Sequence, residues 1–236
     1  MELHQLTEHC WYSDSEPSAD RPSLGYILGT RGKAVIVDSG NSPRHFSEVL
    51  ELIERSGLVP PSFCILTHWH WDHILGLPAV SVPVFCCEKT QAHLKEMMVW
   101  TSDDRKAFFD NNEFARSEYC SPEEIEVRLA DITFDREITF DLGDISVIAR
   151  HVEGPHSDDS VLVYVPEDGM LFAGDSSAGD FSLPNIPYDQ ELLRRYTETV
   201  SSMEFSCFLH SHREPLDRAG TIRFLSEAKE RGFYIF

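Results

Sequence analysis

The stretch Thr67-His68-Trp69-His70-Trp71-Asp72-His73 decides how this chain is interpreted. It places three histidines and one aspartate within six residues, in the pattern H-x-H-x-D-H. Imidazole nitrogens and carboxylate oxygens together form the ligand set that zinc and other borderline divalent metals prefer. In an extended or tightly turned segment, His68 and His70 can point to one side while Asp72 and His73 turn toward a second point. This one loop therefore predicts ligands for two neighbouring metal ions.

A single loop cannot complete two coordination spheres, so further ligands must come from elsewhere in the chain. Three later segments offer them, and each directly follows a predicted strand: Gly154-Pro155-His156-Ser157, Ala173-Gly174-Asp175 and His210-Ser211-His212. An isolated His-x-His pair is more often a surface or core feature, but partners at successive strand ends favour a metal site. The histidines without such a context are expected to be ordinary surface or structural residues: His4, His9, His45, His93 and His151.

The order of the predicted elements indicates two packed sheets with helices on the outside. Strands are expected at 24–28, 33–37, 63–66, 84–87, 125–129, 132–134, 145–151, 160–165, 170–173 and 207–209. Helices are expected from Ser42 and Pro43 to Gly57, over 88–114, over 190–202 and over 217–231. Residues 10–22 are expected to be a loop or flap. This pattern predicts an α/β (α+β) fold, a four-layer αββα sandwich of two mixed β-sheets flanked by helices.

One domain is expected across residues 1–236, because no repeat or low-complexity block divides the chain. Within it, residues 88–119 carry more apolar side chains than one amphipathic helix face needs: Met97, Met98, Val99, Trp100, Phe108, Phe109 and Phe114. We predict a helical, lid-like insertion that forms a pocket wall for an apolar acyl group, or else a dimer surface. A plain pair of core helices is the alternative.

The composition is that of a folded globular protein, with 42% hydrophobic residues, 15 Phe and 4 Trp. The sequence has neither a membrane-span pattern nor a secretory signal at its start, so a cytoplasmic location without membrane association is expected. Six scattered cysteines without a C-x-x-C pair predict reduced thiols, with disulfides as the alternative. The formal charge of −20 and the lack of a basic patch argue against nucleic-acid partners.

Taken in order, these motifs resemble those of the metallo-β-lactamase fold superfamily. The resemblance runs from Leu24 to about Ala219: Val37-Asp38-Ser39-Gly40, H-x-H-x-D-H, the Gly-Pro-His turn, Gly174-Asp175 and a late histidine. It implies two divalent metal ions, with zinc preferred and iron or manganese as alternatives. By this resemblance one metal is bound by His68, His70 and His156, the other by Asp72, His73 and His212, and Asp175 bridges both. His210 is the alternative to His212.

The resemblance also implies a dinuclear metal-dependent hydrolase. Two cations about 3.5–4 Å apart would lower the pKa of a bridging water, so that a metal-bridging hydroxide attacks the substrate. Asp72 is expected to be catalytic by orienting this hydroxide, and Asp175 to fix the distance between the metals. A bridging carboxylate is absent from true β-lactamases and typical of thioesterases of the glyoxalase II kind, lactonases and phosphodiesterases.

The expected substrate is a small molecule, namely a thioester, lactone or other ester. The chain departs from glyoxalase II at Ile74-Leu75-Gly76-Leu77, where that enzyme usually has a glycine pair, and it shows no basic C-terminal helical region for glutathione. The alternatives on the same fold are a phosphodiesterase and a mononuclear iron oxidoreductase similar to persulfide dioxygenases. A metal-binding regulatory protein with little turnover, and a homodimer, also stay open.

Overall fold

Two β-sheets form the centre of the computed structural model, which describes residues 1–181 and 183–235. The first has seven strands in the order β1 (Leu3–Gln5), β2 (Cys10–Ser13), β3 (Gly25–Leu28), β4 (Ala34–Val37), β5 (Phe63–Ile65), β6 (Val84–Cys87) and β7 (Ile132–Phe134). The second has six in the order β13 (Leu216–Asp217), β12 (Cys207–His210), β11 (Met170–Gly174), β10 (Val161–Val165), β9 (Ser146–His151) and β8 (Glu137–Asp141). Both sheets are mixed, because β4 to β7 pair in parallel, as do β11 and β12, while the other pairs are antiparallel.

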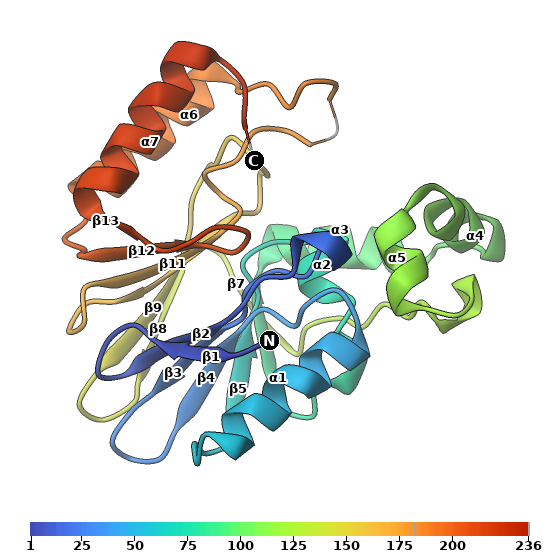
Figure 1. The fold of residues 1–236 in the computed structure, drawn as a ribbon, viewed down its shortest axis with the longest axis horizontal. Coiled ribbons are helices and arrows are strands. Elements are labelled where there is room, and N and C mark those ends of the chain that lie inside the picture. The colour runs from blue at the N-terminus through green and yellow to red at the C-terminus, as the bar shows by residue number, and fades with distance from the viewer. Residues whose placement is uncertain (182, 236) are drawn as a thin grey trace.

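Helices cover the outer face of each sheet. The helices are α1 (Pro43–Arg55), α2 (Trp71–Ile74), α3 (Glu88–Met98), α4 (Ser102–Asn111), α5 (Glu113–Glu118), α6 (Gln190–Ser202) and α7 (Arg218–Arg231). In Figure 1, α6 and α7 lie over the second sheet, and α1 lies on the opposite side of the molecule against the first sheet. The predicted four-layer αββα sandwich is therefore confirmed.

Three hydrophobic clusters fill the spaces between the four layers. Neighbouring residues of a strand point to opposite faces of the sheet, so Tyr26 packs with the helix α1 side while Ile27 faces the second sheet. In the same way, Val163 faces the first sheet and Leu162 packs with residues of α6 and α7. The middle strands are thus buried on both faces, which fixes the separation and register of the sheets.

Helix α1 shows why local signals in the sequence were reliable. The hydroxyl of Ser42 accepts a hydrogen bond from the backbone N–H of His45 at 3.0 Å, and Pro43 occupies the first turn. Past the C-terminus of the helix, Gly57 has a φ of +73°, a left-handed conformation that favours glycine. The predicted start and end of this helix are both confirmed.

The strand predicted at 125–129 is wrong, because this stretch is irregular. Its apolar side chains pack against the outer face of the first sheet, as the pattern indicated, but the backbone has no strand partner in the sheet. At Ala130, the residue after this stretch, the side chain of Gln91 replaces a strand partner. Its amide accepts from the N–H of Ala130 and donates to the Ala130 carbonyl, both at 3.1 Å. The spacing of the apolar residues thus predicted that this stretch contacts the core, but not whether its backbone pairs with a strand.

Four strands lie outside the prediction: β1, β2, β8 and β13. The expected loop at 10–22 begins instead as β2, in which Cys10, Trp11 and Tyr12 pair with β3. β1, β8 and β13 are end strands of their sheets, with one neighbour each, and three of the four are four residues or shorter. Short strands of this kind give a weak signal because few of their residues are buried.

Residues 88–119 form three helices where one helical stretch was expected. Thr101 and Asp104 form a capping box that starts α4, and Asn112 caps α5 through hydrogen bonds of 3.0 Å from the N–H groups of Phe114 and Ala115. None of the side chains of α4 is buried, and Figure 1 shows α4 and α5 projecting to the right of the sandwich. The lid and the dimer surface proposed for this segment stay predictions.

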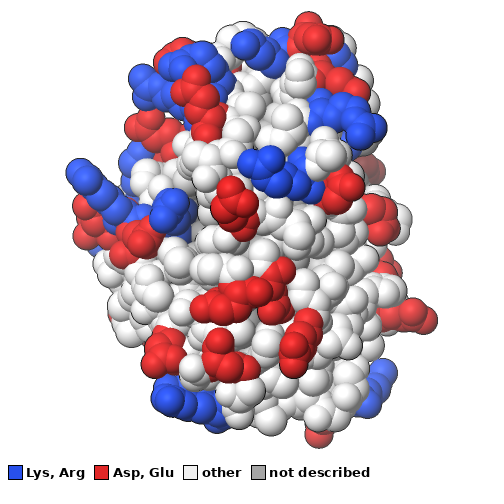
Figure 2. Space-filling view, turned by 90° about the vertical axis from the view of Figure 1, so that its left-hand side faces the viewer, with Lys and Arg blue, Asp and Glu red and all other residues white. Residues whose placement is uncertain are grey.

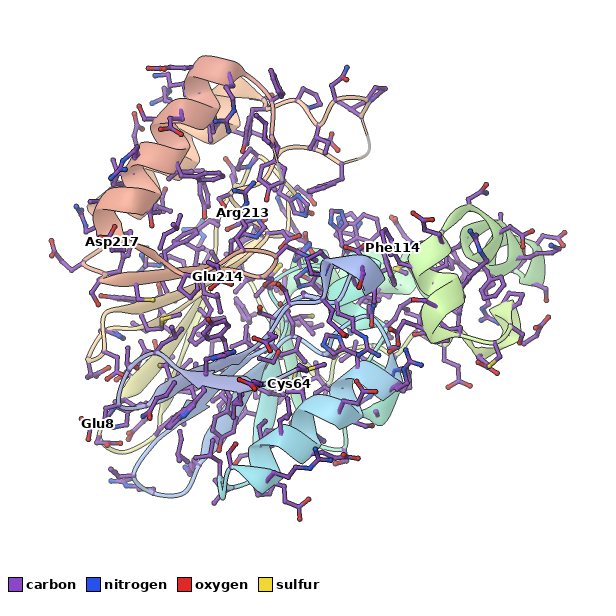
Figure 3. All side chains as sticks on the ribbon, viewed as in Figure 1. Glu8, Cys64, Phe114, Arg213, Glu214 and Asp217 are labelled. Carbon is purple, nitrogen blue, oxygen red and sulfur yellow. The ribbon has the colours of Figure 1, made fainter. Side chains whose placement is uncertain are left out.

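His9 joins the two sheets at the left-hand side of Figure 1, where Figure 3 labels its neighbour Glu8. Its Nδ1 lies 2.9 Å from Asp168 and its Nε2 lies 3.0 Å from Asp144, and both carboxylates belong to turns of the second sheet. Both ring nitrogens must carry hydrogen to make both bonds, so the contact favours the imidazolium form. Figure 2 shows this side, with acidic side chains gathered across its middle and most basic ones toward the top.

Replacing His9 with glutamine should lower the free energy of unfolding more at about pH 5.5 than at about pH 8.5, because histidine titrates near pH 6.5 in unfolded chains. Partial burial by itself lowers the pKa of His9, but the hydrogen bonds and charges of Asp168 and Asp144 outweigh it and raise the pKa. A raised pKa in the folded chain gives a contribution that is complete below the unfolded pKa and is lost as the pH rises through the folded pKa. Urea unfolding of both chains at both pH values tests this. An equal difference at the two values would contradict it.

The six cysteines are all free, as predicted. Cys64 is fully buried on β5 within the cluster that packs against α1 (Figure 3). Among the residues that the structure describes, no helix combines the length and the apolar character needed to cross a membrane.

The sandwich brings five chain segments to one edge. β9 and β11 run in the same direction, since each is antiparallel to β10, and β12 is parallel to β11. The loops that follow these strands meet those that follow β4 and β5, and the N–H of Val161 donates to the carbonyl of Thr67 at 2.7 Å across the two sheets. The predicted metal-binding side chains lie on these loops, except Asp72 and His73, which lie on the short helix α2 that continues the loop after β5.

Candidate metal centre

The structure brings the seven predicted side chains together in two adjacent groups. The first group is His68, His70 and His156, and the second is Asp72, His73, Asp175 and His212. In each group the nitrogen or oxygen atoms that could bind a metal lie within 4.8 Å of one another. Residues separated by up to about 140 positions in the chain therefore converge on one place.

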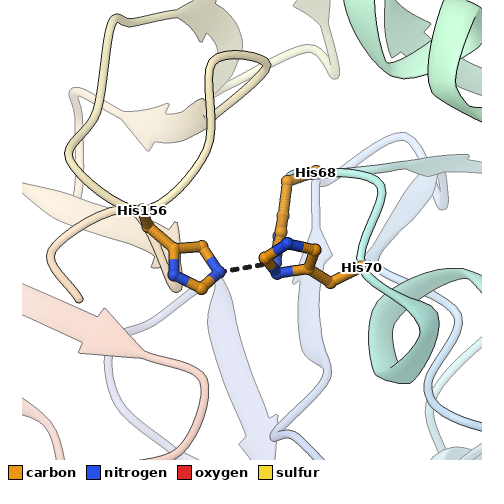
Figure 4. Close-up of side chains that lie close together, drawn as sticks. All are labelled: His68, His70 and His156. Carbon is orange, nitrogen blue, oxygen red and sulfur yellow. Dashed lines mark hydrogen bonds between the residues drawn. The ribbon is translucent and has the colours of Figure 1, made fainter. Parts of the chain in front are cut away.

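The first group consists of three imidazoles that face one another, of which His68 and His156 are buried and His70 is half-buried (Figure 4). The Nε2 atoms of His68 and His156 are 3.2 Å apart, and the ring of His70 lies 4.5 Å from that of His156 between centroids. The Nδ1–H of His156 donates to the carbonyl of Gly179 at 3.0 Å, which leaves the Nε2 lone pair directed into the group.

Burial keeps these three imidazoles neutral. Burial and the neighbouring histidines together lower the pKa of His68 well below its usual value and that of His156 to about 4. The pKa of His70 is also lowered, mainly because the ring is removed from solvent. A neutral imidazole is the form that binds a metal, so the first group is ready to act as a three-nitrogen site.

The second group combines two carboxylates with two imidazoles. His212 Nε2 lies 3.0 Å from Asp72 Oδ2 and 3.4 Å from Asp175 Oδ2, and His73 Nε2 lies 3.2 Å from Asp72 Oδ2. Burial alone would lower the pKa of His212, but Asp175 and Asp72 raise it to about 9. The pKa of His73 is raised well above its usual value, because Asp72, Asp38 and Asp175 outweigh its burial. The field at this point therefore favours positive charge.

Asp175 lies between the two groups. Its Oδ2 atom is 4.0 Å from His156 Nε2 in the first group and 3.4 Å from His212 Nε2 in the second. Neighbouring histidines keep the pKa of this carboxyl well below its usual value despite its burial. A carboxylate that reaches both groups is the geometry expected of a residue bridging two cations.

A second, independent observation also fits a bound divalent metal. His73 Nε2 and Asp175 Oδ1 are both buried without a hydrogen-bond partner among the described residues. They lie 3.6 Å apart, which is too far for a hydrogen bond to each other. Buried polar atoms are normally satisfied, so these two call for a ligand such as a cation at this point. Nitrogen and carboxylate donors are those that zinc, iron and manganese accept.

Asp38 holds residues 67–73, here called the metal loop, in place. The sequence analysis quoted Asp38 without giving it a role. Its carboxylate accepts hydrogen bonds from His73 Nδ1–H at 2.8 Å, from the backbone N–H of Thr67 at 2.7 Å and from the Thr67 hydroxyl at 2.8 Å. It therefore turns the Nε2 atom of His73 toward Asp72 and Asp175. The signal in the sequence was a charged residue directly after the apolar stretch 34–37. In the structure this stretch is the fully buried strand β4, and Asp38 has a φ of +66°.

His212, rather than His210, lies in the second group. His210 is buried behind it, where its Nδ1 accepts from the N–H of His212 at 3.2 Å and its Nε2 lies 3.3 Å from the hydroxyl of Tyr234. Both nitrogens of His210 thus have partners within the protein. Burial lowers the pKa of His210 to about 3, which keeps it neutral.

Aromatic rings stand beside the first group. Trp69 lies 4.8 Å from His70 and Phe181 lies 5.1 Å from His156, measured between ring centroids. Phe181 is 38% exposed, and Trp69 is half-buried. Aromatic rings therefore border the three-histidine group on the sides of His70 and His156.

A family model described as the metallo-beta-lactamase superfamily matches residues 19–205 of the chain. The chain belongs to the metallo-beta-lactamase superfamily. The recognition made from the order of the motifs is confirmed, and the matched stretch contains six of the seven converging side chains, all but His212.

Curated relatives resemble the chain over part of their length. A lactamase-like protein of Pestalotiopsis microspora is 28% identical over 65% of this chain and 38% of its own length. An atrochrysone carboxyl ACP thioesterase of Claviceps purpurea is 27% identical over 65% of this chain and 39% of its own. The chain thus spans less than half the length of the curated relatives it matches. A metallo-beta-lactamase structure from Pontibacter korlensis has a TM-score of 0.65 at 22% identity, covering 95% of this chain and 98% of that one, which establishes the shared fold.

Proposed function

We propose that the chain is a dinuclear metal-dependent hydrolase that cleaves a small thioester, lactone or other ester. The observation that carries the proposal is the convergence of a three-histidine group and a carboxylate-histidine group on the shared carboxylate of Asp175. Membership of the metallo-beta-lactamase superfamily, whose members are mostly hydrolases, supports it. When bound, a pair of divalent cations provides an activated water near neutral pH and polarises the substrate oxygen that it contacts.

The side chains of the two groups have different roles in the proposal. His68, His70 and His156 would hold one cation as neutral imidazoles, while Asp72, His73 and His212 would hold the other. Asp72 has a second role in the proposal: its carboxylate oxygen orients the attacking water and receives a proton from it. Asp175 would bind both cations and keep their separation constant.

The proposed substrate class rests on three features. A carboxylate that reaches both groups is present at Asp175. The half-buried Trp69 and the exposed ring of Phe181 can contact an apolar acyl group beside the first group. One of the relatives is named as a thioesterase, which makes a thioester the first substrate to test. Zinc as the metal, a cytoplasmic location and a homodimer stay predictions.

The proposal is tested by purifying the chain without added metal and measuring hydrolysis of a panel of thioesters, lactones, carboxylic esters and phosphodiesters. We expect hydrolysis of at least one of the first three classes, its loss after chelation and its return when zinc or manganese is added back. Full metal loading without turnover on any of them would contradict the hydrolase and favour a metal-binding regulatory role. A single ferrous ion with oxygen uptake would favour the dioxygenase alternative.

A further inference from the structure

We propose that Asp20 is a positioning residue for His212, so that the segment before β3 supplies an outer part of the metal centre. The inference rests on the proposed function, because it assigns His212 to a metal. Asp20 Oδ1 lies 3.9 Å from Nδ1 of His212. The other ring nitrogen of His212, Nε2, faces Asp72 and Asp175. Asp20 therefore stands on the side of the ring that points away from the proposed metal.

The backbone at Asp20 is held in an uncommon conformation. Asp20 follows a short 3₁₀ helix (Pro17–Ala19) and has φ 49° and ψ 45°, in the left-handed region that few residues other than glycine adopt. The side-chain amide of Asn41 fixes it there, donating to the carbonyls of Ala19 at 2.8 Å and Asp20 at 3.2 Å. Such a conformation persists only where the surroundings enforce it.

The next residue anchors the same segment from the other side. Arg21 has a side chain only 6% exposed, and its guanidinium donates to Glu118 at 2.7 and 3.1 Å, to Glu16 at 2.9 Å and to Glu48 at 2.7 Å. The guanidinium of Arg21 thus pairs with three glutamates and not with the Asp20 carboxylate. Within the described part of the chain, His212 is the one ion-pair partner of the Asp20 carboxylate, which makes no hydrogen bond.

Other histidines of the centre have an outer partner on the nitrogen that points away from the groups. His73 has Asp38 at 2.8 Å, and His156 has the carbonyl of Gly179 at 3.0 Å. Such partners fix the ring orientation of a metal-binding histidine and its tautomer. At 3.9 Å, Asp20 would complete the same arrangement for His212 through a bridging water or a small rotation of its side chain.

The experiment compares zinc binding and kinetics in the wild type, Asp20→Ala, Asp20→Asn and the control Asp14→Asn. Asp14 lies in the same segment and loses the same charge, but it pairs with His4 and the N–H of Glu2. Zinc affinity is measured by competition with a chromophoric chelator. For the more weakly held ion in Asp20→Ala we expect about 10- to 100-fold lower affinity, the usual effect of losing an outer partner. Asp20→Asn keeps an acceptor for Nδ1–H and should recover part of the affinity, and Asp14→Asn should match the wild type.

Kinetics separate positioning from direct substrate contact. A positioning role predicts a lower kcat with little change in KM, whereas a raised KM with normal zinc affinity would mean that Asp20 touches the substrate, which overturns the proposal. Unchanged zinc affinity in Asp20→Ala overturns it as well. Zinc content and hydrolysis of the wild type distinguish this inference from the proposed function. Two bound zinc ions without hydrolysis would reject the hydrolase only, because the comparison of zinc affinities would still test the role of Asp20. A wild type that binds fewer than two ions would reject both.

Discussion

Replacing Asp175 with alanine should reduce the bound zinc from two ions per chain toward one and lower hydrolysis by more than about 100-fold. Loss of an outer partner of a metal-binding residue already lowers affinity or activity by about 10- to 100-fold, and Asp175 is proposed to contact both ions directly. Its carboxylate lies within 4.0 Å of a histidine nitrogen in each group. Elemental analysis and initial rates on the best substrate of the panel measure the two effects.

Asp110→Ala is the matched control for this substitution, because it removes an exposed carboxylate of α4 that pairs with Lys106. It should keep both zinc ions and full activity. Two tightly bound ions and wild-type rates in Asp175→Ala would contradict the bridging role. A variant that fails to fold would be recognised by its circular dichroism, and Asp175→Asn then replaces it, because asparagine has the same shape and lacks the charge.

Replacing Gly76 with alanine should lower the free energy of unfolding by about 3 kcal/mol, at the upper end of the usual range for overpacking. A Cβ atom at Gly76 would lie 1.8 Å from the carbonyl oxygen of Ser39 and 3.0 Å from that of Ser42. Both are backbone atoms, so the chain itself must move. Because the N–H of Ser39 donates to the carbonyl of His73 at 3.0 Å, the movement should also weaken zinc binding. Urea unfolding and chelator competition measure the two consequences.

Gly32→Ala separates steric clash from backbone strain. A Cβ at Gly32 would meet no atom within 4 Å, but its φ of +67° is unfavourable for alanine. This variant should therefore lose only about 1–2 kcal/mol and keep its zinc affinity. If Gly76→Ala were no more destabilised than Gly32→Ala and bound zinc equally well, the close contact with Ser39 would not constrain the metal loop.

The parts of the fold that the sequence predicted well are those with strong local signals. Helix α1 has a capping serine, a proline in its first turn and a terminal glycine, and its bounds follow from them. Helix α6 likewise spans the predicted range, from Gln190 to Ser202. By contrast, β2 is defined by its pairing with β3, and Ala130, which follows the irregular stretch at 125–129, is bonded to the side chain of Gln91 rather than to a strand. Such long-range partners leave little trace in a local pattern.

The same distinction applies to the metal centre. The density of histidine and aspartate in 68–73, together with single residues after later strands, was enough to name the side chains that converge. Asp38 could be quoted but not given a role, because its three hydrogen bonds depend on how β4 and β5 lie side by side. Asp20 gave no signal at all, since its approach to His212 connects segments about 190 positions apart through the folded sandwich.

The central claim is that seven side chains from four segments of the chain hold two cations, and anomalous X-ray diffraction from crystals of the zinc-loaded chain tests it most directly. We expect two peaks about 3.5–4 Å apart. One should lie about 2.0–2.2 Å from nitrogens of His68, His70 and His156, and the other at similar distances from Asp72, His73 and His212, with Asp175 between them. A single peak in zinc-saturated crystals, or peaks bound by other residues, would contradict the account.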